Sequence, residues 1–192
     1  MAKESTFKNM TITLLTITLL SSASLGIVYS LTEEPINEAK NAKVNDAISK
    51  VLPEFDNMPT SQKFEREVDG GKITFYPATK GGKPVGTAIQ TFTKNGFGGQ
   101  IDLMVGFLPN STIHAIEVID HKETPGLGDK MERGKSKFSV QFQGKNPSEF
   151  KLSVRKDGGN VDAITASTIS SRAYCEAVQR AYDAFIKEGD IK

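Results

Sequence analysis

The first feature of the hydrophobic pattern is a long uncharged segment near the N-terminus. No charged residue lies between Lys8 and Glu33, and the intervening sequence is rich in Leu and Ile. A helix needs about 20 such residues to cross the hydrocarbon core of a bilayer, and Ser and Thr side chains are tolerated there because they bond back to helix carbonyls. We therefore expect a transmembrane helix over residues 9–32.

The pattern then changes to a polar segment with a stripe of apolar residues. These residues recur at a spacing close to 3.6, which predicts an amphipathic helix. Pro35 suits the first turn of such a helix, and Pro53 ends it. We expect residues 33–53 to form a stalk helix that joins the membrane segment to a domain over residues 54–192.

The start of this domain has the pattern of an antiparallel sheet. Runs of β-branched and aromatic residues are separated by Gly-rich turns such as Asp69-Gly70-Gly71. Closely spaced strands joined by tight turns pair in an antiparallel manner. The expected strands cover residues 72–76, 85–92, 100–107, 113–120 and 150–154.

The last expected element is a helix over about residues 170–187. Cys175, the one cysteine of the chain, lies in this helix beside Glu176, so we expect a semi-buried thiol that is not a nucleophile. The fold class is α+β: a mainly antiparallel sheet packed with helices, preceded by one N-terminal transmembrane helix. The apolar stripe of the last helix, interpreted as core, comprises Ala173, Ala177, Val178, Ala181, Tyr182 and Phe185.

Composition narrows the function classes. The chain has 24 basic and 23 acidic residues, without the basic bias of nucleic-acid-binding proteins. Two His and one Cys argue against a zinc site or a disulfide framework. The sequence contains no P-loop, no GxGxxG after a strand and no Ser-His-Asp arrangement of interest, so we assign no catalytic residue and no metal ligand.

The charges that flank the uncharged segment predict its orientation. Lysines precede it and glutamates follow it, which places residues 1–8 in the cytoplasm and everything after about residue 32 outside. A cleaved signal peptide with Ser22-Ala23-Ser24 as its cleavage site is the alternative, and it also exports the domain. Apolar residues resume over 25–31, which favours a retained anchor.

Three motifs of the domain could carry chemistry. The turn Asn95–Gly99 allows close backbone approach to a ligand, although it also fits a simple hairpin. The run Glu123-Thr124-Pro125-Gly126-Leu127-Gly128 is an irregular turn whose N–H groups can bond the edge of a heteroaromatic ring, with Leu127 on its face. The run Asp162–Thr168 places hydroxyls at a helix start, where they either cap the helix or bind a phosphate.

Together these motifs, with Gly96-Phe97-Gly98-Gly99 and Met104-Val105-Gly106, resemble the FMN-binding G subunit of the Rnf electron-transport complex. They are more distantly similar to the C subunit of the sodium-translocating NADH:quinone reductase. The resemblance extends over essentially the whole chain. It implies an electron-carrying subunit of a membrane-bound, ion-translocating ferredoxin:NAD oxidoreductase in the bacterial cytoplasmic membrane, with the other subunits and the bilayer as partners and no independent turnover.

The resemblance also implies covalent FMN. The family motif Asp-x-x-Ser/Thr-Gly-Ala-Thr carries FMN as a phosphoester on its last Thr, which is Thr168 here. This chain has Ala166 in place of Gly, which requires a backbone without positive φ there, and Ser167 in place of Ala, which adds a competing hydroxyl. The expected cofactor-binding residues are Thr168, Asp162, Thr165, Ala166, Ser167, Glu123, Thr124, Gly126, Leu127, Gly98 and Gly99.

The Thr168 hydroxyl is not acidic enough to attack a phosphate unaided, and the sequence shows no adjacent base. Attachment therefore needs a flavin transferase, and the resemblance implies one that uses FAD and magnesium. Arg172 is a candidate contact of the phosphate. Two other functions stay open: an anchored or secreted FMN-carrying protein that serves an extracytoplasmic reductase, and a non-redox anchored binding domain in which the hydroxyls only cap the helix.

Overall fold

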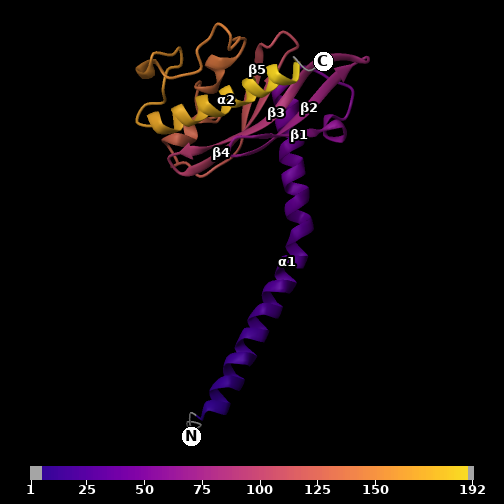
Figure 1. Ribbon diagram of the computed structural model, residues 1–192, viewed down its shortest axis with the longest axis vertical. Helices are drawn as coiled ribbons and strands as arrows, with labels where there is room; N and C mark the ends of the chain where they lie inside the picture. Colours follow the sequence, from indigo (N-terminus) through magenta and orange to yellow (C-terminus); the bar gives the residue numbers. More distant parts are fainter. Residues whose placement is uncertain (1–5, 190–192) are drawn as a thin grey trace. The chain divides into compact units, whose positions relative to one another are not determined.

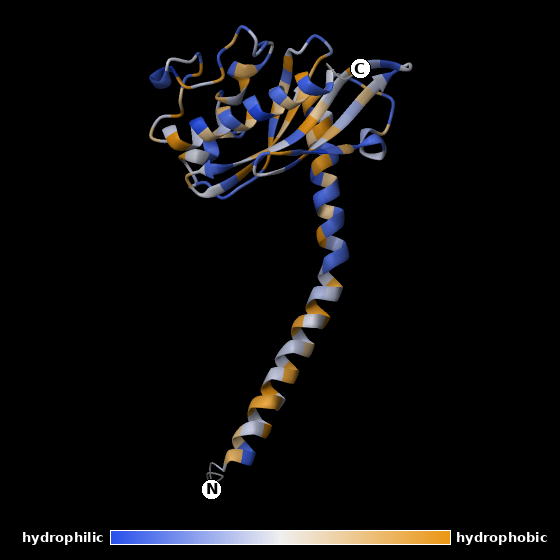
Figure 2. Cartoon of the chain, in the orientation of Figure 1, coloured by the Kyte–Doolittle hydropathy of each residue, from blue (hydrophilic) through white to orange (hydrophobic). Residues whose placement is uncertain are grey.

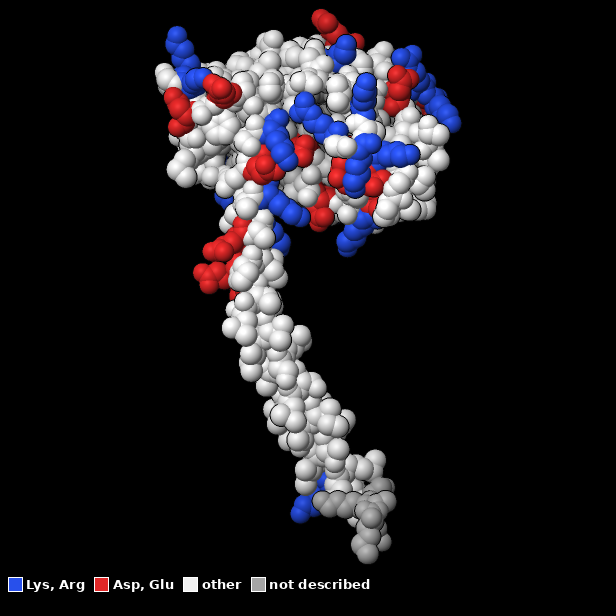
Figure 3. Space-filling model, turned by 180° about the vertical axis from the view of Figure 1, so that it is seen from behind, with Lys and Arg blue, Asp and Glu red and all other residues white. Residues whose placement is uncertain are grey.

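The computed structural model describes residues 6–189, which divide near residue 42 into two units. Helix α1, Phe7–Val51, begins in the first unit and ends in the second (Figure 1). Within the described residues it is the helix that is long and apolar enough to cross a membrane. Its first part is apolar or weakly polar (Figure 2), and its charged residues are confined to the two sides of the uncharged segment (Figure 3).

The helices expected over residues 9–32 and 33–53 form one continuous helix, because α1 continues through Pro35. A proline inside a helix removes one backbone hydrogen bond, and here this loss does not end the helix. The hydroxyls of the uncharged segment bond back to carbonyls of the preceding turn, as expected. Their bonds run from Thr11 to Phe7, from Thr13 to Asn9, from Thr16 to Ile12 and from Thr18 to Leu14.

The second unit contains one five-stranded antiparallel sheet in the order β1-β2-β3-β4-β5 (Figure 1). This confirms the expected fold class. The strands are β1 Phe64–Val68, β2 Gly71–Lys80, β3 Lys83–Gly96, β4 Gly99–Phe107 and β5 Ile113–His121. The other elements are the 3-10 turns η1 Pro59–Gln62, η2 Gly128–Met131, η3 Ser139–Phe142 and η4 Arg155–Asp157, and helix α2 Thr168–Gly189.

Two strand assignments differ from the expectation. Strand β1 was not predicted, because the charged residues of Phe64-Glu65-Arg66-Glu67-Val68 obscure its alternation. The strand expected over 150–154 is wrong, since only Val154 forms a β-bridge there, with Val161. The apolar side chains that suggested a strand, Leu152 and Val154, instead fill the core from an irregular segment.

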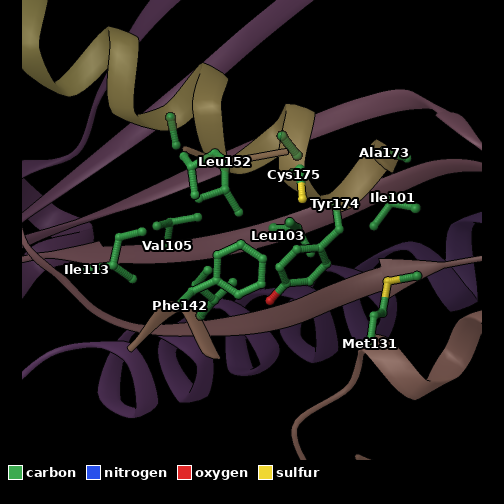
Figure 4. Packing of buried hydrophobic residues seen from close by; sticks show 14 of the residues in the cluster. Ile101, Leu103, Val105, Ile113, Met131, Phe142, Leu152, Ala173, Tyr174 and Cys175 are labelled. Carbon is green, nitrogen blue, oxygen red and sulfur yellow. The ribbon is translucent and has the colours of Figure 1, made fainter. Parts of the chain in front are cut away.

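Helix α2 lies across one face of the sheet and covers the main core (Figure 1). Tyr174 and Phe142 are fully buried there beside strand residues such as Leu103 (Figure 4). The predicted apolar stripe of α2 is confirmed. Ala173, Ala177, Val178 and Ala181 are buried, and Tyr182 and Phe185 pack against the cluster.

A second, smaller core contains the end of α1. Ala47, Ile48 and Val51 pack there with sheet residues such as Met104. The carbonyl oxygen of Val51 lies 3.0 Å from Nδ1 of His114, so the histidine partners the last carbonyl of the helix. Gly106 also lies directly against this carbonyl, and a Cβ at that position would clash with it. The end of α1 is thus fixed to the sheet through close backbone contact.

Candidate functional site

Three segments that are far apart in the sequence form one pocket of about 340 Å³. They are the β3–β4 turn, the segment that follows β5, and the start of α2. The residues that line the pocket are Phe97, Glu123, Thr124, Leu127, Gly128, Ala166, Ser167, Thr168, Ile169 and Ser170. Six of them belong to the set of site residues expected from the sequence. The structure thus brings the run Glu123–Gly128 and the run Asp162–Thr168 together at one pocket.

Glu123 connects these three segments. Its carboxylate is buried, with 6% of the residue exposed. Oε1 accepts the backbone N–H of Gly98 at 3.0 Å, and Oε2 accepts the Ser170 hydroxyl at 2.6 Å. Gly128 lies so close to this carboxylate that a side chain there would clash with it. Since buried acceptors need partners, these contacts fix the turn, the loop and the helix start together.

His121 holds the backbone of Glu123 in place. The Glu123 N–H donates to Nδ1 of His121 at 3.0 Å, so Nε2 carries the proton of the neutral ring and faces Glu132 Oε1 at 2.8 Å. Lys135 donates to the same Glu132 oxygen and lies 3.0 Å from Asp129. A hydrogen bond from Lys135 lowers the pKa of the Asp129 carboxyl. His121 therefore acts on the site through the backbone of Glu123.

The backbone at the start of α2 differs from the expectation. Ala166 adopts a left-handed conformation with φ of +61°, whereas we expected that the Gly-to-Ala change required a backbone without positive φ. This conformation favours glycine, and it is strained at an alanine because the Cβ lies too close to the following carbonyl oxygen. The turn is held by the Ser167 N–H, which donates to the Ile164 carbonyl at 3.0 Å, and by Ser171, whose hydroxyl donates to the Ser167 carbonyl.

The two neighbouring hydroxyls of this turn have different surroundings. Ser167 is buried, and its hydroxyl donates to Ser170 Oγ at 2.8 Å. Thr168 is half-exposed, lines the pocket and opens the helix. The first residues of a helix have backbone N–H groups without intrahelical acceptors, and these groups favour an anion. Thr168 therefore combines an accessible hydroxyl with a helix start.

Apolar side chains surround the mouth of the pocket. Phe97 is 70% exposed, Ile169 is 49% exposed and Leu127 is 41% exposed. Of the described residues that line the pocket, Glu123 alone is ionisable, and it is buried and bonded. Apolar walls beside a hydroxyl at a helix start fit a flat aromatic group that carries a phosphate.

Other expected site residues lie away from the pocket lining. Asp162 is exposed and pairs with Arg155, with 2.6 Å between Oδ1 and Nε. Thr165 is also exposed, and Gly126 and Gly99 shape turns with positive φ. Gly98 contributes through its N–H to Glu123. None of these five lines the pocket among the residues that the structure describes.

Four lining residues were not predicted. Phe97 and Gly128 lie within the motifs that carry the family resemblance, and this position could have identified them as site residues. Ile169 and Ser170 follow the hydroxyl motif directly, and nothing in the sequence distinguishes their roles. Arg172, the candidate phosphate contact, is instead bound by Asp157 through two hydrogen bonds of 2.7 and 2.8 Å.

A larger groove of about 940 Å³ lies along β1, η4 and α2 and is separate from this pocket. Its three arginines are each paired with a carboxylate: Arg66 with Glu188, Arg172 with Asp157 and Arg180 with Glu176. Cys175 lies at this groove and is 3% exposed, and burial raises its pKa to about 12. The thiol is protonated and inert at neutral pH, in agreement with its expected structural role.

Comparison with known proteins supports the site. The FMN-binding domain family matches residues 96–183, a range that contains all three segments of the pocket. The G subunit of an ion-translocating oxidoreductase complex from Vibrio cholerae serotype O1 is 33% identical over 175 residues, which cover 85% of this chain and 83% of the relative. The corresponding protein of Shewanella oneidensis is 34% identical over 173 residues, which cover 85% of this chain and 82% of the relative.

A third relative of the same name, from Pseudoalteromonas atlantica, is 32% identical over 173 residues, covering 84% of this chain and 80% of the relative. The similarity thus extends well beyond the range that the FMN-binding domain family matches. This agrees with the resemblance inferred from the motifs. The chain belongs to the family of the G subunits of the ion-translocating oxidoreductase complexes.

Proposed function

We propose that this chain is the electron-carrying FMN subunit of a membrane-bound, ion-translocating ferredoxin:NAD oxidoreductase, with FMN bound through a phosphoester to Thr168. The observation that carries this proposal is the position of Thr168. This residue is partly exposed, lines the pocket and begins α2, whereas the adjacent Ser167 is buried and its hydroxyl is bonded to Ser170. Family membership supports a redox function for the pocket.

Attachment is a phosphoryl transfer in which Thr168 is the acceptor. Thr168 Oγ1 forms a bond to the phosphorus of the FMN half of FAD, the pyrophosphate bond breaks, and AMP leaves. The hydroxyl proton passes to a base of the flavin transferase, since no carboxylate or imidazole is among the described hydrogen-bond partners of Thr168. A magnesium ion bound by the transferase with FAD would stabilise the leaving phosphate.

The residues of the pocket would hold the attached group and set its surroundings. Bound FMN supplies reversible one- and two-electron transfer. Phe97, Leu127 and Ile169 would offer apolar contact to its ring and exclude water. The first N–H groups of α2 would favour the phosphoester, and Glu123 holds together the segments that surround it.

We also propose the placement of the chain relative to the membrane. Residues 1–8 lie in the cytoplasm, residues 9–32 span the bilayer, and residues 33–53 connect the span to the FMN domain over 54–192 on the outer side. A covalent link suits this location, because a dissociable FMN would be lost outside the cell. The span has no charged residue, which supports an ion pathway through other subunits of the complex.

Flavin fluorescence on a denaturing gel tests the attachment site. The full chain is produced together with a flavin transferase, and Thr168→Ala is compared with Thr60→Ala. Thr60 lies in η1, outside the attachment motif and the pocket lining, so its variant should remain fluorescent. We expect Thr168→Ala to lose the fluorescent band. A fluorescent Thr168→Ala chain would contradict the assignment.

A further inference from the structure

We propose that Ser170 and Glu123 determine which of two adjacent hydroxyls receives the flavin, by holding the Ser167 hydroxyl inside the protein. This inference rests on the proposed function, because it concerns the same attachment reaction. A serine directly precedes the acceptor threonine, so two hydroxyls stand next to each other at the start of α2. The structure buries Ser167 and leaves Thr168 partly exposed.

Two consecutive hydrogen bonds direct the Ser167 hydroxyl towards buried partners. Ser167 Oγ donates to Ser170 Oγ at 2.8 Å, and Ser170 Oγ donates to Glu123 Oε2 at 2.6 Å. Ser170 is fully buried, Ser167 is 8% exposed and Glu123 is 6% exposed. The bond to a carboxylate is the stronger kind, and it orients the Ser170 hydroxyl so that its lone pairs face Ser167.

The backbone of Ser167 is fixed by a different set of contacts. Its N–H donates to the Ile164 carbonyl at 3.0 Å, and its carbonyl accepts the Ser171 hydroxyl at 2.9 Å. The Ile164 N–H in turn donates to Ser171 Oγ at 2.9 Å. Loss of the Ser170 hydroxyl would therefore leave these backbone contacts in place, while it frees the Ser167 side chain and removes one donor from Glu123. Ser171 holds the backbone but has no bond to the Ser167 hydroxyl.

These contacts explain selectivity in chemical terms. At either residue, the hydroxyl oxygen would form the bond to the FMN phosphorus of FAD, AMP would leave, and the proton would pass to the transferase. Only a hydroxyl at the surface can reach that phosphorus. Without Ser170 Oγ, the Ser167 hydroxyl becomes a buried donor that lacks an acceptor, which disfavours its inward rotamer relative to one that faces the pocket and water.

Peptide mapping of the full chain, produced together with the transferase, tests this inference. We expect nearly all flavin of the unaltered chain on Thr168, with a small background on Ser167. In Ser170→Ala, the ratio of Ser167-linked to Thr168-linked peptide should rise about five- to thirtyfold above this background, the range that loss of one such bond implies. Ser139→Ala is the control, a buried serine of η3 outside the pocket lining, and should leave the ratio unchanged.

A second pair of variants gives an independent reading. Thr168→Ala should carry no flavin, although Ser167 is adjacent, whereas the double variant Thr168→Ala/Ser170→Ala should carry flavin on Ser167. An unchanged ratio in Ser170→Ala, or no flavin in the double variant, would overturn this inference. The proposed function would still stand in that case, provided that the unaltered chain carries flavin on Thr168. No flavin on the unaltered chain would instead contradict the proposed function itself.

Discussion

Glu123 offers a graded test of how the pocket is assembled. Its carboxylate accepts the Gly98 N–H through one oxygen and the Ser170 hydroxyl through the other. In Glu123→Ala both donors lose their acceptor. In Glu123→Gln the amide oxygen can still accept the Gly98 N–H, whose direction is fixed. The amide NH₂ then faces Ser170, whose hydroxyl can rotate to accept.

The magnitudes follow from the number of bonds lost. A hydrogen bond to a charged group contributes about 1.5–3 kcal/mol, and the removed carboxylate also relieves its own burial cost. We therefore expect Glu123→Ala to lower the free energy of unfolding by about 2–4 kcal/mol. We expect Glu123→Gln to lower it by about 1–2 kcal/mol, because one bond is retained and the other is weakened.

Urea unfolding of the full chain in detergent measures these differences. The chain has no Trp, so the fluorescence of tyrosines such as the fully buried Tyr174 reports the transition of the domain. Glu149→Ala is the control, since Glu149 is exposed and its loss should change stability by less than about 0.5 kcal/mol. Equal destabilisation by Ala and Gln, or none by Ala, would refute the connecting role of Glu123.

Three further changes test other parts of the structure. Gly106→Ala should destabilise the chain by about 2 kcal/mol or more in urea unfolding, because its Cβ meets the Val51 carbonyl, whereas Gly134→Ala has open space and should not. Ala166→Gly should raise the free energy of unfolding by up to about 1 kcal/mol, since relief of the left-handed strain exceeds the added chain entropy of glycine in the unfolded state. A lower free energy of unfolding would show that the strain is absent. Cys175 should resist alkylation at pH 8 in the folded chain and react in urea. Its raised pKa of about 12 keeps the thiol protonated until the pH approaches that value. Rapid alkylation of the folded chain would contradict the burial of Cys175.

The sequence predicted the elements whose pattern is local. The uncharged N-terminal segment, four of the five strands and the apolar face of α2 follow from spacing and turn residues. Strand β1 was missed because its charges obscure the alternation, and the strand expected over 150–154 is an irregular segment with apolar residues. Whether such a segment pairs or simply packs depends on contacts distant in the sequence, which periodicity does not contain.

The site residues likewise divide into those that local motifs predict and those that depend on distant contacts. Motif spacing identified the loop after β5 and the hydroxyl run, and the structure places both at one pocket. The pairing of Glu123 with Ser170 joins residues 47 positions apart, and a single sequence gives no signal for it. The left-handed Ala166 is a related case, because a strained backbone at a non-glycine residue depends on the surrounding contacts and local preference argues against it.

The intact mass of the full chain tests most directly whether Thr168 carries FMN. The chain is purified after production with a flavin transferase and measured under denaturing conditions, so that dissociable cofactor is removed. We expect a mass that exceeds the sequence mass by one FMN less one water, with this increment absent in Thr168→Ala. An unmodified mass in the unaltered chain would contradict this attachment, and the hydroxyls at the start of α2 would then serve only to cap and order the helix.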